Sequence, residues 1–215
     1  MRLYDYDASG NCLKVRLLLG LLGREYERVP VDIFAGDTLT DAYGRLNPLR
    51  ETPVLETGDG DVITQSPAIL WYLAEGTPYL PEDPVARAHV LQWLIFEQER
   101  IMGTLAGVRF RVITGRAAAD SRGVVARLEA GRAALGILDA HLGGTPFLVT
   151  GTPTIADLAL YAYVSRAPEA GADLDGFPAV RAWLDALRAL PGFDDDLVPY
   201  PPNAQAGASR SIYDV

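Results

Sequence analysis

The spacing of apolar residues along this chain changes about a third of the way from the N-terminus, and that change limits the folds that the chain can adopt. The opening third alternates short β-like and helical stretches, whereas the apolar spacing after a proline-containing loop is helical. A chain of 215 residues is long for one compact domain and short for three. We expect an α/β domain over residues 1–76, a linker over 77–83, an all-helical domain over 84–199 and a tail over 200–215.

The first domain has the element order strand, helix, strand, hairpin and helix. Residues 2–5 and 26–31 are β-like, and the apolar residues between them have helical spacing. The Gly-Asp-Gly turn at 58–60 joins two short strands as a hairpin. Ser66 and Pro67 open a further helix, because a hydroxyl suits the N-cap and proline suits the next position. This order is that of a thioredoxin-like domain.

The composition and charge exclude several classes of partner. The formal net charge of -9 opposes binding to phosphate backbones and anionic lipids, so we expect no nucleic-acid and no membrane partner. No apolar run approaches the ~20 residues of a membrane span, and residues 1–5 lack the apolar region of a secretion signal. We therefore expect a cytoplasmic protein. With one cysteine, Cys12, and two histidines, His89 and His141, no metal site is expected.

The loop between the first strand and the first helix, Ser9-Gly10-Asn11-Cys12, is the first candidate site. Unpaired amides at a helix start favour an anion such as a thiolate. Ser9 or Asn11 could equally act as a helix cap and no more. Ser9 and Cys12 also occupy the two cysteine positions of a Cys-x-x-Cys pattern, with serine at the exposed one. We expect Cys12 to be a small, buried, inert side chain rather than the site of a mixed disulfide.

Several phrases of the sequence, in their order and spacing, resemble the cytosolic glutathione transferases. They are the N-terminal loop followed by Lys14-Val15-Arg16, the stretches Asn47–Leu55 and Gln65–Leu73, the box Thr154–Asp157, and the stretch Phe177–Leu184. The likeness covers residues 1 to about 195. It implies a thioredoxin-like domain that binds glutathione as co-substrate, followed by an all-α helical-bundle domain, in a homodimer.

The resemblance implies that the Ser9 hydroxyl donates a hydrogen bond to the glutathione sulfur, as in serine-type bacterial branches. A free thiol of pKa about 8.5 is only ~3% thiolate at pH 7. A hydrogen bond worth ~2.7 kcal/mol more to the thiolate than to the thiol lowers that pKa by about two units. The Asn11 amide could serve the same sulfur, as in disulfide-reducing bacterial relatives, and the sequence does not rank the two residues.

Two further phrases imply contacts with the tripeptide. Thr52 and Pro53 resemble the family's cis-proline turn, whose preceding residue pairs through its backbone with the cysteinyl unit of glutathione. Gln65 and Ser66 match the site of the γ-glutamyl group, where a hydroxyl and open amides receive the carboxylate. Ser66 also suits a simple N-cap, and both roles can hold at once.

The sequence departs from the family pattern at Glu51, where lysine or glutamine often helps to hold the tripeptide. A glutamate beside the glycine carboxylate would repel it. Either Arg50 takes over as the cationic partner, or Glu51 faces solvent. This departure bears on glutathione affinity and leaves the expected fold unchanged.

The helical domain carries two sets of candidate residues. Thr154 and Asp157 predict a capping box, which is a structural feature. Arg109, Arg111 and Tyr161 are predicted to line the second-substrate pocket, although an exposed helix face explains them as well.

The predicted function is that of a glutathione transferase, which activates the thiol for attack on a small hydrophobic electrophile. Conjugation, dehalogenation, isomerisation through a thiol adduct and disulfide reduction are all open. The alternatives are a glutathione-dependent disulfide oxidoreductase, with a disulfide as substrate, and a non-catalytic binding or regulatory protein of the same fold.

Overall fold

The computed structural model describes residues 1–214, which form two compact units. The first unit contains Met1–Leu73 and the segment that begins at Asp194, and the second contains Ala74–Phe193. The boundary between Leu73 and Ala74 lies a few residues before the expected linker at 77–83. The C-terminal segment belongs with the first unit, although sequence reasoning gave its residues 194–199 to the helical domain.

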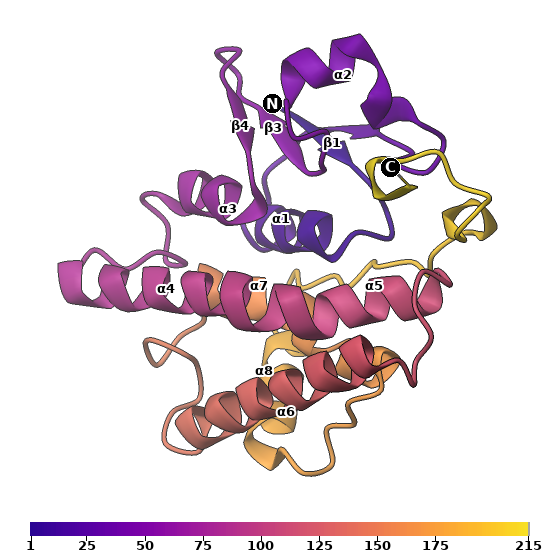
Figure 1. Cartoon of the computed structure of the whole chain (residues 1–215). Coiled ribbons are helices and arrows are strands. Elements are labelled where there is room, and N and C mark those ends of the chain that lie inside the picture. Colours follow the sequence, from indigo (N-terminus) through magenta and orange to yellow (C-terminus); the bar gives the residue numbers. More distant parts are fainter. Residues whose placement is uncertain (215) are drawn as a thin grey trace. The chain divides into compact units, whose positions relative to one another are not determined.

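A four-stranded mixed sheet forms the centre of the first unit (Figure 1). Its strands are β1 (Arg2–Asp5), β2 (Glu27–Pro30), β3 (Val54–Glu56) and β4 (Val62–Thr64), in the order β2-β1-β3-β4. β1 and β2 are parallel, and the other two pairs are antiparallel. A parallel pair needs a crossover connection, which the first helix supplies. The predicted thioredoxin-like fold is therefore confirmed.

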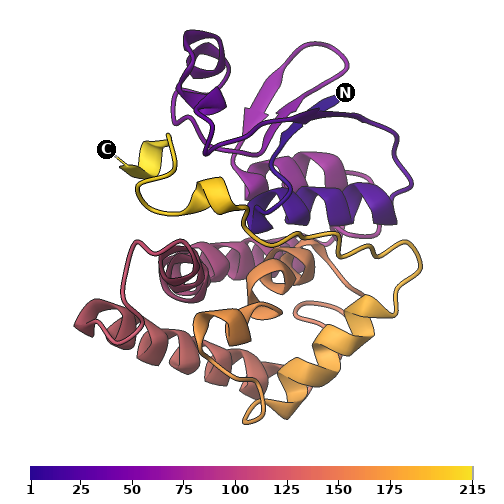
Figure 2. The same cartoon turned by 90° about the vertical axis from the view of Figure 1, so that its right-hand side faces the viewer.

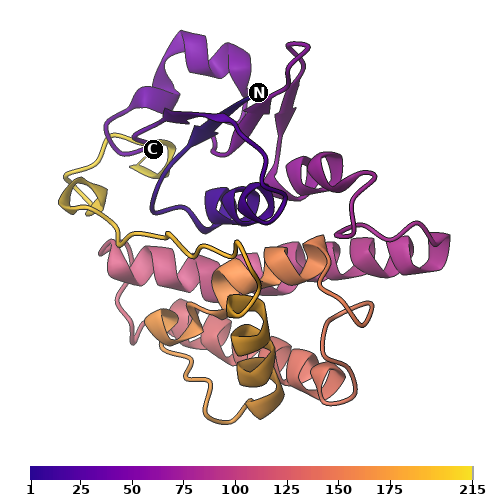
Figure 3. The ribbon, with the colours of Figure 1, turned by 180° about the vertical axis from the view of Figure 1, so that it is seen from behind.

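Helices cover both faces of this sheet. Helices α1 (Gly10–Leu21) and α3 (Ser66–Ala74) lie side by side against one face, and the short α2 (Asp41–Leu46) lies on the opposite side (Figures 1 and 3). Burial of apolar side chains stabilises this packing. The fully buried ones include Leu3, Leu13, Leu17, Leu55, Ile69 and Leu70.

The C-terminal segment packs on the first unit (Figure 2). It contains two short 3₁₀ helices, Pro202–Ala204 and Ile212–Asp214. The backbone N–H of Arg210 donates to the carbonyl oxygen of Phe34 over 2.8 Å. Ala204 is fully buried. The segment is therefore part of the folded unit rather than a frayed end.

The second unit is all-helical, as predicted (Figure 3). Within residues 1–214, no helix combines the length and hydropathy that crossing a membrane requires. The helical elements are α4 (Pro84–Phe96), a π-helical segment (Glu97–Ala106), α5 (Gly107–Ile113), α6 (Arg122–Leu142), α7 (Ile155–Val164), a 3₁₀ turn (Ala167–Ala170) and α8 (Pro178–Arg188).

Every residue of α7 is buried, so this helix forms the core of the second unit. Its start carries the capping box of Thr154 and Asp157, in which the Thr154 N–H donates to the Asp157 carboxylate over 2.8 Å. The same carboxylate accepts from the Leu148 N–H at 3.0 Å and from the Trp183 indole N–H at 2.9 Å. Asp157 thereby fixes the start of α7 to a loop and to α8.

Candidate functional site

Ser9 is the N-cap of α1 and is half-buried. Its Oγ accepts a hydrogen bond from the Cys12 N–H over 3.3 Å, and its own N–H donates to the Tyr6 carbonyl over 2.9 Å. Among the described residues, no hydrogen bond uses the Ser9 hydroxyl proton. The hydroxyl is thus held in place by one bond and can donate a second to a ligand beside the helix start.

Asn11 lies in the first turn of α1 and connects two parts of the site. Its Oδ1 accepts from the Lys14 ammonium at 2.8 Å and from the Ser66 hydroxyl at 3.4 Å. Its side-chain amide donates to no described residue. Asn11 therefore presents a second N–H donor beside the Ser9 hydroxyl, and the geometry keeps both predicted thiolate partners available.

Cys12 is fully buried behind the helix start. Its Sγ accepts from the Tyr6 N–H over 3.4 Å, and burial raises the pKa of the thiol to about 12. A thiol of that pKa is protonated at neutral pH and has little nucleophilic character. The predicted burial of Cys12 is confirmed.

The Thr52–Pro53 peptide bond is cis and directly precedes β3. No hydrogen bond of the described chain uses the backbone N–H or C=O of Thr52. These groups match the pair that the resemblance assigns to the cysteinyl backbone of glutathione. They lie on the same unit as the start of α1.

The start of α3 has an unusual backbone and a buried hydroxyl. Gln65 has φ of 70°, in the left-handed region that non-glycine residues seldom occupy. Strained residues of this kind cluster at ligand sites. Ser66, only 3% exposed, is the first residue of α3, and its hydroxyl donates a hydrogen bond to Asn11 Oδ1. Pro67 has no N–H, so the amides of Ser66 and Ala68 remain to receive an anion.

Arg50 and Glu51 have different surroundings. Arg50, with φ of 57°, donates through Nη1 to the carbonyl oxygens of Thr38 at 2.8 Å and Thr40 at 2.9 Å. Glu51 is exposed, and its carboxylate accepts from the Gln65 amide at 3.3 Å. Arg50 is thus tied to the backbone before α2, while Glu51 extends toward the γ-glutamyl side of the predicted site.

The three residues predicted for the second-substrate pocket have separate environments in the helical unit. Arg109 is buried and pairs with Glu169 at 2.7 Å. Arg111 is exposed and donates to the Gly107 carbonyl of its own helix at 3.2 Å. Tyr161 is fully buried, and its hydroxyl accepts from Arg188 at 3.1 Å. The role of these three residues at a pocket stays a prediction.

Sequence reasoning missed a buried ion network beside α1. Arg16 is 5% exposed and pairs with buried Asp5 at 2.8 Å and with Asp196 at 2.7 Å. Arg28 also contacts Asp5 and Asp196. The only sequence signal was a pair of charged residues, Lys14 and Arg16, inside an otherwise apolar helix. Among residues 1–214, no group of three His, Cys, Asp or Glu side chains is placed to hold a metal ion.

Comparison with known proteins gives two family matches. The family described as "Glutathione S-transferase, N-terminal domain" matches residues 8–75, and "Glutathione S-transferase, C-terminal domain" matches residues 116–186. A maleylacetoacetate isomerase of Rhizobium meliloti is 36% identical over 192 residues, which cover 84% of this chain and 87% of that protein.

Solved structures agree with these matches. A glutathione S-transferase from Pseudomonas fluorescens is 39% identical, with a TM-score of 0.88 over 92% of this chain and 98% of that one. A second family member from Pseudomonas fluorescens, solved with two glutathione molecules bound, is 27% identical, with a TM-score of 0.80 over 91% of each chain.

Proposed function

Since this chain belongs to the glutathione transferase family, we propose that it binds glutathione on its first unit and that Ser9 holds the sulfur as a thiolate. The observation that carries this proposal is the unused hydroxyl proton of Ser9 at the start of α1. The other candidate nucleophile nearby, Cys12, is buried and protonated. The reacting sulfur therefore belongs to glutathione.

The energetics of one hydroxyl and a helix start suffice for this activation. A hydrogen bond to a charged group contributes roughly 1.5 to 3 kcal/mol, and each pKa unit corresponds to about 1.4 kcal/mol. The Ser9 bond thus lowers the pKa of the bound thiol by about one to two units. The amide dipoles at the start of α1 act in the same direction.

Glutathione would lie across the ends of α1, β3 and α3. The free backbone groups of Thr52 suit the cysteinyl unit, and the start of α3 at Ser66 suits the γ-glutamyl carboxylate. We assign the glycine carboxylate to the Arg50 guanidinium, whose Nη1 donates to two backbone carbonyls, and the exposed Glu51 beside it would reduce affinity. The resemblance supports the assignments of Thr52 and Ser66, whereas the Arg50 assignment follows from the departure at Glu51.

The bound thiolate would attack a small hydrophobic electrophile, forming a carbon–sulfur bond while a leaving group departs or a proton is taken up. Isomerisation through a reversible thiol adduct uses the same thiolate, and one relative carries the name of such an isomerase. Glutathione-dependent disulfide reduction is the second candidate, favoured by the unused side-chain amide of Asn11.

We propose a homodimer as the working form, as is usual in this family. Leu91 and Ile95, 47% and 49% exposed, lie one turn apart on α4 and leave apolar surface for a second copy. Light scattering at two concentrations tests this, with the mass of a single 23.2 kDa chain as the contrary result.

The test of the mechanism is an ultraviolet titration of glutathione bound to the wild type, to Ser9→Ala and to Asn11→Ala. The pKa of the bound thiol should be one to two units below that of free glutathione, and should return upward in Ser9→Ala. If the pKa of the bound thiol rises only in Asn11→Ala, the result would favour the function of a disulfide reductase. No depression in the wild type, despite binding, would favour a binding protein.

A matched control separates thiolate stabilisation from loss of a helix cap. Thr40 caps α2 by accepting from the Tyr43 N–H over 3.2 Å, in the same unit as Ser9. Thr40→Ala should cost about 1 kcal/mol of stability, as Ser9→Ala should. It should leave the bound thiol pKa unchanged.

A further inference from the structure

A cavity of about 440 Å³ lies in the first unit, next to the loop that ends at Ser9. Ala8 forms part of its wall. Its volume is within the range of small-molecule sites. Apolar side chains supply part of the lining: Pro30, Val31, Val198, Pro199 and Pro201.

Tyr6 lines this cavity and is only 8% exposed, yet its hydroxyl has no hydrogen-bond partner among the described residues. The ring is held edge-on against Phe34, with centroids 5.7 Å apart. Burial, with the nearby Asp32 and Asp7 carboxylates, raises the pKa of Tyr6, so the phenol stays neutral. An unpaired buried hydroxyl is costly, which points to a ligand or solvent group as its partner.

The charged groups that line the cavity are four carboxylates, of Asp5, Asp7, Asp32 and Asp37. Guanidinium groups neutralise the first two, since Arg28 pairs with both. Among the described residues, Asp32 and Asp37 have no ion pair. The cavity is therefore electronegative on the side formed by Asp32 and Asp37.

Hydrogen bonds fix these two carboxylates in position. Asp32 Oδ1 accepts from the N–H groups of Phe34 at 2.9 Å and Ala35 at 3.1 Å, and Oδ2 accepts from Asn203 at 2.9 Å. Asp37 Oδ2 accepts from the Asp32 N–H at 2.8 Å. None of these donors carries a full positive charge, so the negative charge remains uncompensated.

We propose that this cavity binds a small organic ammonium compound with an aromatic or aliphatic body. The ammonium group would donate to the Tyr6 hydroxyl oxygen and to the carboxylates of Asp32 and Asp37, and the body would pack on the proline and valine side chains. A carboxylate-bearing compound would be repelled. The site is separate from thiolate activation, because none of its groups is assigned to glutathione.

Calorimetric titration of the full chain without glutathione tests the site with three probes of one shape: phenethylamine, 2-phenylethanol and phenylacetate. We expect phenethylamine to bind about tenfold more tightly than the alcohol, because its bonds are charge-assisted, and phenylacetate to bind least. Equal affinities for amine and alcohol, or no heat with the amine, would overturn the proposal. Because glutathione is absent, these results leave the proposed transferase mechanism untouched.

Two variants locate the binding. Tyr6→Phe removes only the unpaired hydroxyl, so it should weaken phenethylamine binding severalfold without lowering the melting temperature. Asp37→Asn keeps an acceptor oxygen for the Asp32 N–H and removes a charge, so it should also weaken the amine but strengthen phenylacetate. Unchanged amine affinity in both variants would refute this location.

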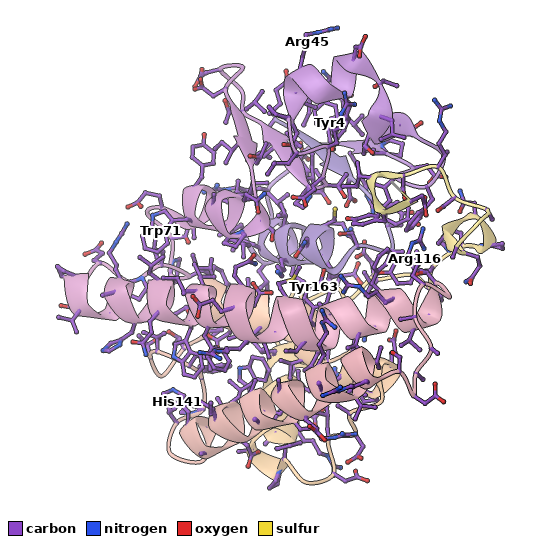
Figure 4. All side chains as sticks on the ribbon, viewed as in Figure 1. Tyr4, Arg45, Trp71, Arg116, His141 and Tyr163 are labelled. Carbon is purple, nitrogen blue, oxygen red and sulfur yellow. The ribbon has the colours of Figure 1, made fainter. Side chains whose placement is uncertain are left out.

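Tyr4→Phe is the matched control. Tyr4 lies two residues away on β1 (Figure 4), and its hydroxyl bonds to Glu56 at 3.0 Å instead of lining the cavity. The affinity of the Tyr4→Phe variant for phenethylamine should equal that of the wild type. An equal loss in Tyr4→Phe and Tyr6→Phe would show an indirect effect and count against the site.

Discussion

The side-chain Oδ1 of Asn11 accepts a hydrogen bond from the buried Ser66 hydroxyl over 3.4 Å, which joins the first turn of α1 to the first turn of α3. These two helix starts carry the predicted partners of the glutathione sulfur and of its γ-glutamyl carboxylate. The bond therefore couples the positions of the two halves of the proposed site.

Replacement of Asn11 by alanine should weaken glutathione binding. The change removes the acceptor of Ser66 and of the Lys14 ammonium, so the start of α3 loses its support. We expect a three- to tenfold rise in the dissociation constant, which is about 1 kcal/mol, measured by calorimetry. Ser66→Ala removes the donor of the same bond, so the double variant should lose less affinity than the sum of the two single losses. Strictly additive losses would argue against the coupling.

Stability should fall at alkaline pH because of Cys12. Burial raises the pKa of its thiol to about 12, whereas an unfolded cysteine has a pKa of about 8.5. The folded state thus holds the thiol proton more tightly than the unfolded state does. The contribution of the protonated thiol to the free energy of unfolding is therefore complete below about pH 8.5 and is lost as the pH rises toward 12.

The measurement for Cys12 compares urea unfolding of the wild type and of Cys12→Ala between about pH 8 and 11. Tyrosines also titrate in this range, so the difference between the two proteins isolates the thiol. We expect the wild type to lose stability more steeply, by up to about 1.4 kcal/mol per pH unit. Parallel curves would contradict the buried-thiol assignment.

Replacement of Asp196 by asparagine should loosen the C-terminal segment. Asp196 accepts from buried Arg16 at 2.7 Å, and the change removes one of the two carboxylate charges that pair with this guanidinium, the other being that of Asp5. We expect a loss of about 1 to 3 kcal/mol in unfolding free energy and faster tryptic cleavage at Arg210. Asp194→Asn is the control, because Asp194 is exposed and makes no described ion pair. Equal cleavage rates in the two variants would refute the prediction.

Replacement of Asp157 by alanine should destabilise the helical unit. Four donors would lose their buried acceptor: the N–H and the hydroxyl of Thr154, the N–H of Leu148 and the indole N–H of Trp183. We expect a loss of about 3 kcal/mol in thermal or urea unfolding. Asp185→Ala removes an exposed carboxylate from α8 and should stay within about 0.5 kcal/mol of wild type. A similarly small effect of Asp157→Ala would show that the box is dispensable.

The sequence by itself determined the order of the elements in the first unit and the caps at two helix starts. Ser9 and Thr154 cap the helices that the sequence predicted, whereas Ser66, expected at an N-cap, is the first helical residue of α3. Caps and strand alternation depend on residues within a few positions of one another, so the chain shows them directly. The resemblance to a family added the cis bond before Pro53.

Only the tertiary structure decided which charges and polar groups are buried together. Asp5 and Asp196 meet at Arg16 across almost the whole chain, and Tyr6, whose buried hydroxyl is unpaired, lines a cavity walled in part by the C-terminal segment. No local pattern signals these contacts, because a salt bridge or a cavity wall depends on the relative placement of elements far apart in sequence. Hydrophobic burial sets that placement through the sum of many side chains.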